Sequence, residues 1–115
     1  MTVTIYHNPR CSKSRKTLEL IQEKNISPII IEYLKSKLTS SEIKLILQSL
    51  DCNARSIIRN SEAAYKSLNL EDGSLSEQTL INAIVENPEL LQRPIVLNKD
   101  SAVIGRPPEK VLEIL

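Results

Sequence analysis

The sequence is poor in aromatic residues. It contains no Phe, no Trp and only three Tyr among 115 residues. Proteins that bind single-stranded nucleic acid stack bases on aromatic side chains, and a formal net charge of +1 gives no general attraction to nucleic acid or to anionic lipid. We therefore expect no nucleic-acid partner. With 41% hydrophobic residues the chain can still bury a core, which is expected to be aliphatic.

Glycine, histidine and cysteine are also scarce. Two glycines, Gly73 and Gly105, are too few for a glycine-rich phosphate loop. One histidine and two separated cysteines, Cys11 and Cys52, show no spacing typical of a metal site, and they make no disulfide framework. We expect free thiols in a reducing compartment, with no metal and no bound cofactor.

Long apolar runs are absent as well. No stretch approaches the ~18 residues of a membrane span, and the N-terminal residues carry neither the basic nor the apolar part of an export signal. These absences predict a cytoplasmic protein that has no membrane partner. The length predicts a single domain covering residues 1–115.

The order of the predicted elements indicates an α/β fold. Val3–Tyr6 and the residues 28–34 are predicted to be buried strands, with a helix from Cys11 to about Asn25 between them. This βαβ unit predicts two parallel strands joined by a right-handed crossover. Towards the end, the residues 95–97 and 102–104 predict a β-hairpin that a last helix follows.

The middle of the chain, from about residue 36 to 92, is predicted to be a helical insertion. Thr39-Ser40-Ser41-Glu42 has the pattern of a capping box, and aliphatic residues follow it at helical spacing. The residues 53–70 predict two short helices divided near Asn60-Ser61. Ser74 or Ser76 is expected to cap a further helix, which stops before Pro88.

The residues around Cys11 are the densest group of reactive and anion-binding types in the chain. A cysteine in the first turn of a helix faces unpaired N–H groups and the positive end of the helix dipole, and both favour the thiolate. The same N–H groups, with the hydroxyls of Ser12 and Ser14, are suited to an oxyanion. Three neighbouring residues are expected to add positive charge: His7, Arg10 and Arg15.

Other interpretations of Cys11 are open from the residues alone. A lone cysteine at a strand–helix junction is often only a small buried residue. A tyrosine-phosphatase loop needs Arg six residues after the cysteine, where this chain has Thr17. Because Cys11-x-x-Ser14 lacks a second thiol, an external thiol must cleave any disulfide that Cys11 forms. Cys52 has no anion-binding neighbours and is predicted to be structural.

Several segments together resemble the glutaredoxin-linked arsenate reductase family. They are His7-Asn8-Pro9-x-Cys11-Ser12-x-Ser14-Arg15, Arg93-Pro94-Ile95-Val96 and Gly105-Arg106-Pro107-Pro108-Glu109. The segment Arg55-Ser56-Ile57-Ile58-Arg59 is similar to the mid-chain arginine segment of that family. The resemblance extends from Thr4 to Leu115. Because the sequence stops inside the predicted last helix, it resembles a short branch without the C-terminal tail that some members carry.

This resemblance implies a thioredoxin-like core, made of the βαβ unit, the hairpin and the last helix, with the helical insertion. It also implies that Cys11 attacks arsenate, that His7 favours its thiolate and that Ser14 forms a hydrogen bond close by. Glutathione would then attack the intermediate, and glutaredoxin would clear the mixed disulfide as arsenite leaves. The Arg93–Pro94 bond is expected to be cis. The residues implied to hold the oxyanion are Arg59, Arg93 and Arg106.

The residues themselves support part of this assignment. Arginine forks fit tetrahedral oxyanions and keep their charge. Arg93 and Arg106 each precede a proline, which favours an extended backbone at a strand edge, although a single arginine is usually a solvated surface residue. Two alternatives stay open: a glutathione-dependent thiol oxidoreductase with another substrate, and an Spx-like regulator that binds RNA polymerase.

Overall fold

The structure is a computed structural model that describes residues 2–115. Its packing divides the chain into two compact units. One contains the residues up to Ser36 together with Arg93–Leu115, and the other is Lys37–Gln92. Within the described residues, no helix is both long enough and apolar enough to cross a membrane.

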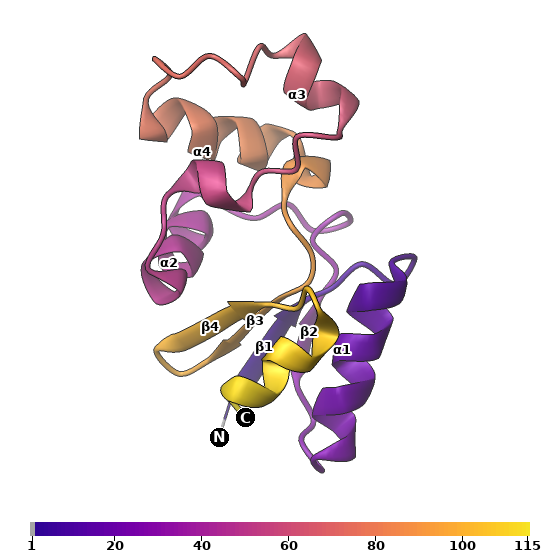
Figure 1. Cartoon of the computed structure of the whole chain (residues 1–115). Coiled ribbons are helices and arrows are strands. Elements are labelled where there is room, and N and C mark those ends of the chain that lie inside the picture. Colours follow the sequence, from indigo (N-terminus) through magenta and orange to yellow (C-terminus); the bar gives the residue numbers. More distant parts are fainter. Residues whose placement is uncertain (1) are drawn as a thin grey trace. The chain divides into compact units, whose positions relative to one another are not determined.

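The first unit is built on a four-stranded sheet with the order β2-β1-β3-β4 (Figure 1). β1 pairs in parallel with β2 and antiparallel with β3, while β3 and β4 form an antiparallel hairpin. The predicted parallel βαβ unit and the predicted hairpin are therefore confirmed. The strands are β1 (Val3–Tyr6), β2 (Ile29–Ile31), β3 (Ile95–Asn98) and β4 (Ser101–Ile104).

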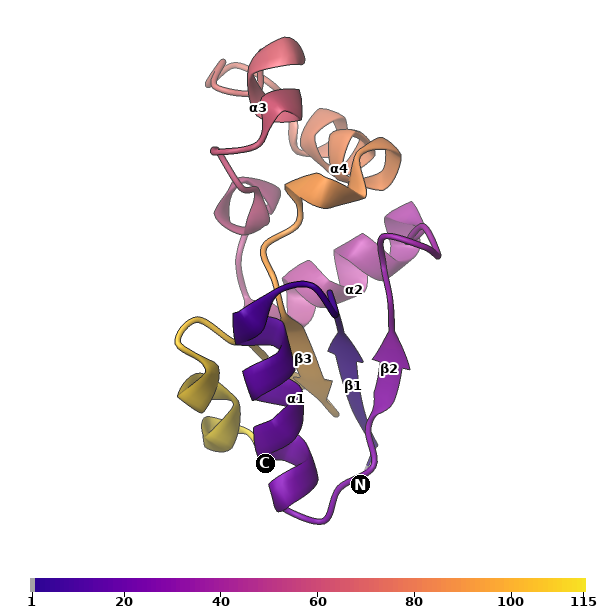
Figure 2. The same cartoon turned by 90° about the vertical axis from the view of Figure 1, so that its right-hand side faces the viewer.

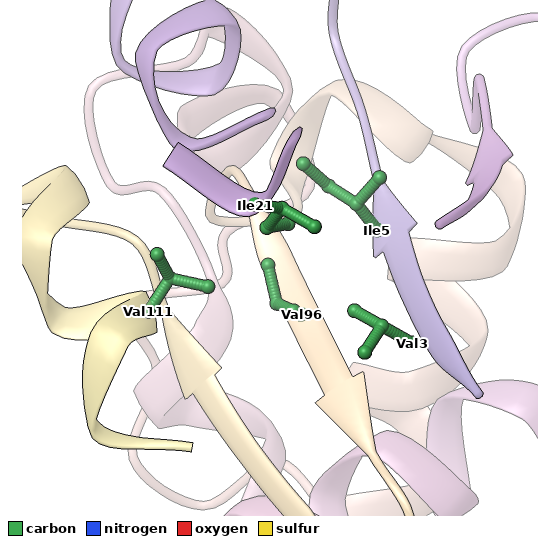
Figure 3. Packing of buried hydrophobic residues seen from close by; sticks show 5 residues of the cluster. All are labelled: Val3, Ile5, Ile21, Val96 and Val111. Carbon is green, nitrogen blue, oxygen red and sulfur yellow. The ribbon is translucent and has the colours of Figure 1, made fainter. Parts of the chain in front are cut away.

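Two helices lie side by side on one face of this sheet (Figures 1 and 2). They are α1 (Ser12–Glu23) and the 3₁₀ helix η3 (Pro108–Glu113). Figure 3 shows side chains from both helices pointing towards side chains of β1 and β3. This fully buried cluster is aliphatic throughout, as expected: Val3, Ile5, Ile21, Val96 and Val111. The cluster holds α1 against the sheet, so that the helix begins just beyond the end of β1.

One prediction for this unit is wrong in detail. The residues 28–34 were expected to form a buried strand, but β2 spans only three residues, and Ile29 and Ile30 are 53% and 46% exposed. The reason is that β2 is the edge strand, which pairs with β1 alone. The predicted last helix is present as η3, a 3₁₀ helix of six residues.

The second unit is helical. It contains α2 (Ser40–Leu50), η1 (Ala54–Ile57), α3 (Ala63–Ser67), α4 (Glu77–Glu86) and η2 (Pro88–Leu90). The predicted capping box at Thr39 is present, with bonds in both directions between Thr39 and Glu42. Ser76 caps α4 by accepting the N–H of Thr79 at 3.1 Å. η1 and α3 confirm the two short helices expected in the residues 53–70, whereas η2 was not predicted.

Arg55 ties this second unit together. Its Nη1 donates to the carbonyl oxygen of Leu70 at 2.7 Å, and its Nη2 donates to that of Asp72 at 3.0 Å. These bonds connect η1 with the turn that follows α3. Within the predicted arginine segment 55–59, Arg55 therefore has a structural role.

Candidate active site

Cys11 is the N-cap residue of α1, one position before the predicted first turn. Its backbone is extended, with φ −94° and ψ 123°, and its N–H donates to the carbonyl oxygen of Asn8 at 3.0 Å. An N-cap side chain lies over the unpaired N–H groups of the next residues. Cys11 forms no capping bond of the usual geometry, but the N–H groups of Ser14 and Lys13 act on its sulfur.

The surroundings of the Cys11 sulfur favour the thiolate. Burial raises the pKa of this thiol, but a hydrogen bond from the Arg93 side chain, the N–H groups of Ser14 and Lys13 and the charge of Arg93 lower it further than burial raises it. The net result is a pKa below the ordinary value of a cysteine. A larger thiolate fraction makes the sulfur a better nucleophile at neutral pH.

The positive charge at the sulfur comes from a distant part of the chain. The sequence placed it on His7, Arg10 and Arg15, but the residue that acts on the thiol is Arg93. Arg15 instead donates through Nη1 to the carbonyl oxygen of Pro9 at 2.9 Å. This bond stabilises the connection between β1 and α1. No local pattern could show that Arg93 reaches Cys11.

Two of the three predicted oxyanion residues lie next to each other. Arg106 donates through Nη1 to the carbonyl oxygen of Arg93 at 3.3 Å. The Arg93–Pro94 bond is cis, as expected, and the Arg106–Pro107 bond is cis too, which was not predicted. The first unit thus places one cysteine and two arginines together from three separate segments.

Gly105 allows these segments to approach. Its N–H donates to the carbonyl oxygen of Pro94 at 2.9 Å. A Cβ at this position would lie 2.6 Å from the Oγ1 of Thr17 on α1 and 2.8 Å from the Cγ of Pro94. Only glycine therefore lets the chain after β4 pack against both α1 and the segment that carries Arg93.

His7 and Ser14 form a buried pair. The Nδ1 of His7 lies 2.6 Å from the Oγ of Ser14, and that Oγ also accepts the N–H of Asn8 at 3.0 Å. Burial lowers the pKa of His7, Glu32 raises it and Arg15 lowers it, which leaves it below the ordinary value. The ring is therefore mainly neutral at pH 7, so it cannot supply the positive charge that was expected of it.

Arg59, the third predicted oxyanion residue, belongs to the second unit. Its N–H donates to the carbonyl oxygen of Leu90 at 2.7 Å, and an isolated bridge joins the neighbouring Ile58 and Leu91. Its Nε lies 3.6 Å from the Oε1 of Glu62. These contacts hold the residue within its own unit, and its action on a ligand at Cys11 stays a prediction.

The second cysteine differs from the first. Burial and the charges of Glu77 and Asp51 raise the pKa of Cys52. Both cysteines are free thiols. Among residues 2–115, no group of three or more His, Cys, Asp and Glu side chains could hold a metal ion.

Comparison with known proteins identifies the family. The profile of the ArsC family matches residues 6–114. The chain belongs to the ArsC family. It is 50% identical to an arsenate reductase of Haemophilus influenzae, and the alignment covers 100% of both proteins. Its structure superposes on that of an arsenate reductase from Vibrio cholerae with a TM-score of 0.97, at 48% identity, covering 100% of this chain and 98% of the other.

Two proteins of Escherichia coli are also similar to the chain. The uncharacterized protein YfgD is 51% identical, covering 98% of this chain and 96% of YfgD. The arsenate reductase of the same organism is 36% identical, covering 98% of this chain and 80% of that protein. The resemblance seen in the sequence motifs and the thioredoxin-like α/β fold are thereby confirmed.

Proposed function

We propose that this ArsC family member is an arsenate reductase that uses Cys11 as its nucleophile. The observation that carries the proposal is the sulfur at the N-terminus of α1 with Arg93 bonded to it, because this arrangement activates a thiol and attracts an anion at one place. The arsenate reductases of Haemophilus influenzae and Vibrio cholerae support it, since both match this chain along its whole length.

The first step is attack of the Cys11 thiolate on arsenic. A sulfur–arsenic bond forms, and a hydroxyl group of the arsenate takes up a proton and leaves as water. The guanidinium groups of Arg93 and Arg106 neutralise the remaining oxygens, because arginine offers two parallel donors and a permanent charge. Arg59 is proposed as the third arginine of this anion site.

The reduction then needs two electrons, and Cys11 has no second thiol in a CxxC motif, because Ser14 stands at that position. We assign these electrons to thiols from outside the chain. Glutathione attacks arsenic in the Cys11 adduct, and a second hydroxyl group leaves as water. The glutaredoxin thiolate then attacks the glutathione sulfur, which breaks the bond from that sulfur to arsenic and forms a mixed disulfide of glutathione and glutaredoxin. Water hydrolyses the remaining bond between Cys11 and arsenic. The two external sulfurs leave joined as a disulfide, arsenic keeps the electron pair as arsenite, and Cys11 returns as the thiolate. The cycle uses no bound cofactor. Its dependence on free thiols suits a reducing compartment such as the cytoplasm.

The proposal is tested by the formation of arsenite from arsenate with glutathione and glutaredoxin. Wild-type protein and the Cys52→Ser variant are expected to be active, whereas Cys11→Ser is expected to lose turnover. Arg59→Ala should raise the KM for arsenate, and Lys66→Ala, an exposed cation in the same unit, serves as its control. An inactive wild type would exclude arsenate as substrate, and activity in Cys11→Ser would exclude the mechanism.

One alternative has a specific observation in its favour. Escherichia coli contains an arsenate reductase at 36% identity and also YfgD at 51% identity, so this chain is more similar to the relative that has no assigned activity. A glutathione-dependent thiol oxidoreductase with another substrate fits this pattern. Under this alternative, Cys11 forms a mixed disulfide with glutathione, while arsenite formation stays at the background rate. Mass spectrometry of this adduct, together with the arsenite assay, distinguishes the two functions.

A further inference from the structure

A small cavity borders the connection that leads from β1 to Cys11. Its volume is about 230 Å³. The β1–α1 connection forms one wall, and the chain that follows β2 forms the other. The lining residues are His7, Asn8, Pro9, Arg10, Glu32, Leu34 and Lys35.

A backbone hydrogen bond joins the two walls of this cavity, and a second bond stabilises one of them. The N–H of His7 donates to the carbonyl oxygen of Ile31 at 2.8 Å, which continues the pairing of β1 with β2 beyond the strands. On the loop side, the N–H of Arg10 is bonded to the Oδ1 of Asn8 at 3.0 Å. The cavity therefore lies within the first unit, where β1 and β2 pair.

The lining carries charges of both signs. Arg10 is exposed at the loop, and Lys35 lies with its Nζ 3.5 Å from the Oε1 of Glu32. A simple oxyanion such as arsenate would meet the carboxylate of Glu32, and an uncharged ligand would use none of these charges. The lining instead complements a small zwitterion, with Arg10 and Lys35 facing a carboxylate and Glu32 facing an ammonium group.

The position of the cavity relates it to Cys11. Pro9 and Arg10 directly precede the cysteine, so the Cα atoms of Pro9 and Cys11 are at most about 7 Å apart. A tripeptide in extended form spans about 10 Å. A tripeptide whose thiol lies beside the Cys11 sulfur is therefore long enough for one of its ends to lie in the cavity. Because drug-sized ligands need ~300–1,000 Å³, the cavity suits one amino-acid arm rather than a whole tripeptide.

We infer that this cavity binds the γ-glutamyl arm of the thiol co-substrate, whose free α-carboxylate and α-ammonium groups match Arg10, Lys35 and Glu32. The apolar side chains of Pro9 and Leu34 cover its methylene groups. This inference rests on the proposed function, because that function supplies glutathione as the co-substrate. It adds a recognition site for the thiol that is separate from the arginine site for the oxyanion.

Binding is tested without turnover by titrating ¹⁵N-labelled protein with S-methylglutathione, which cannot react. We expect amide shifts at Asn8, Arg10 and Lys35. S-methylcysteinylglycine, which lacks the γ-glutamyl arm, should bind about tenfold more weakly, and so should free glutamate, which lacks the peptide. Glu32→Gln should weaken S-methylglutathione binding about tenfold, as expected for a lost charged hydrogen bond.

Glu19→Gln is the matched control. Glu19 forms an exposed i,i+3 ion pair with Lys16, as Glu32 does with Lys35, but it is not among the residues of the cavity. This variant is expected to bind S-methylglutathione like the wild type. Equal binding of the ligands with and without the γ-glutamyl arm, or unchanged binding by Glu32→Gln, would overturn the inference.

The kinetic counterpart separates this inference from the proposed function. In the arsenite assay, Glu32→Gln should raise the KM for glutathione and leave the KM for arsenate unchanged. If wild-type protein forms no arsenite but still binds S-methylglutathione in a Glu32-dependent way, the proposed substrate is wrong and the cavity assignment stands. If arsenite forms but ligands with and without the γ-glutamyl arm bind equally well, the cavity assignment is wrong and the function stands.

Discussion

The two cysteines of this chain show how strongly the neighbours of a side chain determine its chemistry. Burial acts on both and raises the pKa of each. At Cys11, an arginine and two backbone N–H groups outweigh it, whereas at Cys52 two carboxylates add to it. Modification at neutral pH is therefore expected to select Cys11, although both thiols are partly exposed.

The dependence of Cys11 on Arg93 gives the first prediction. In a Cys52→Ser background, the rate of alkylation by iodoacetamide should rise with pH around a midpoint below 9.0, the value of an unperturbed cysteine. Arg93→Ala should move this midpoint upwards, because the sulfur loses a hydrogen bond and a positive charge. Lys16→Ala, an exposed cation on the same helix, should leave it in place. A wild-type midpoint at 9.0 or higher would contradict the activated thiolate.

His7 gives a second prediction, which is easy to measure because it is the single histidine of the chain. Its ring protons, followed by NMR against pH, should titrate with a pKa below 6.5, since burial opposes the charged form. The unfolded chain then binds more protons than the folded one near and below pH 6.5. The free energy of unfolding should consequently decrease as the pH falls from about 6.5 to the folded pKa. A His7→Gln variant should lack this part of the pH dependence, and titration at or above 6.5 would refute it.

The distance along the chain determines how much of the site could be predicted from the sequence. Cys11, Ser14 and the helix start lie within a few residues of each other, so their local pattern made Cys11 a candidate for an activated thiol beside the interpretation as a small buried residue. The contact of Arg93 with the sulfur depends on tertiary packing, which no local spacing encodes. The family resemblance implied a role for Arg93 at the oxyanion but not this contact. The neutral state of His7 could not be predicted either, because its burial is a property of the fold.

At the scale of elements, Gly105 is the point where β4, α1 and the Arg93 segment meet. Gly105→Ala should destabilise the protein by about 1–3 kcal/mol, because its Cβ would overlap Thr17 and Pro94. The shift of Pro94 should also disturb Arg93 and raise the midpoint of Cys11 alkylation. Urea unfolding and the alkylation profile measure the two effects.

Gly73 provides the matched control for this substitution. A Cβ at Gly73 would meet no atom within 4 Å. Gly73→Ala should therefore change the stability by at most a few tenths of a kcal/mol and leave the titration of Cys11 unchanged. Equal stability of the two alanine variants would show that the close approach at Gly105 does not constrain the site.

Local signals predicted some elements better than others. The capping box at Thr39 and the serine cap of α4 were found correctly, because a cap depends on residues three positions apart. The burial of β2 was predicted wrongly, since a run of isoleucines looks the same in a central strand and in an edge strand. The order of the strands decides between them, and that order arises from long-range pairing.

At the scale of the whole molecule, the chain consists of two compact units, and Arg55 holds part of the second one together. Arg55→Ala removes two hydrogen bonds to carbonyl oxygens and should destabilise this unit by about 2–5 kcal/mol. Hydrogen exchange should become faster at amides within the residues 54–72 than in α1. Lys66→Ala, which keeps both bonds, is the control. Uniform acceleration over all amides would show that the two units unfold together.

The division of the chain also has a consequence for the thiol. The polypeptide returns from the second unit to the first between Gln92 and Arg93, and Arg93 is the residue whose side chain bonds to the Cys11 sulfur. Loss of structure in the second unit would release the backbone one peptide bond before that arginine. We therefore expect the pKa of Cys11 to depend on the folding of Lys37–Gln92, a segment that does not contain it. The rate of Cys11 alkylation would then report whether Lys37–Gln92 is folded.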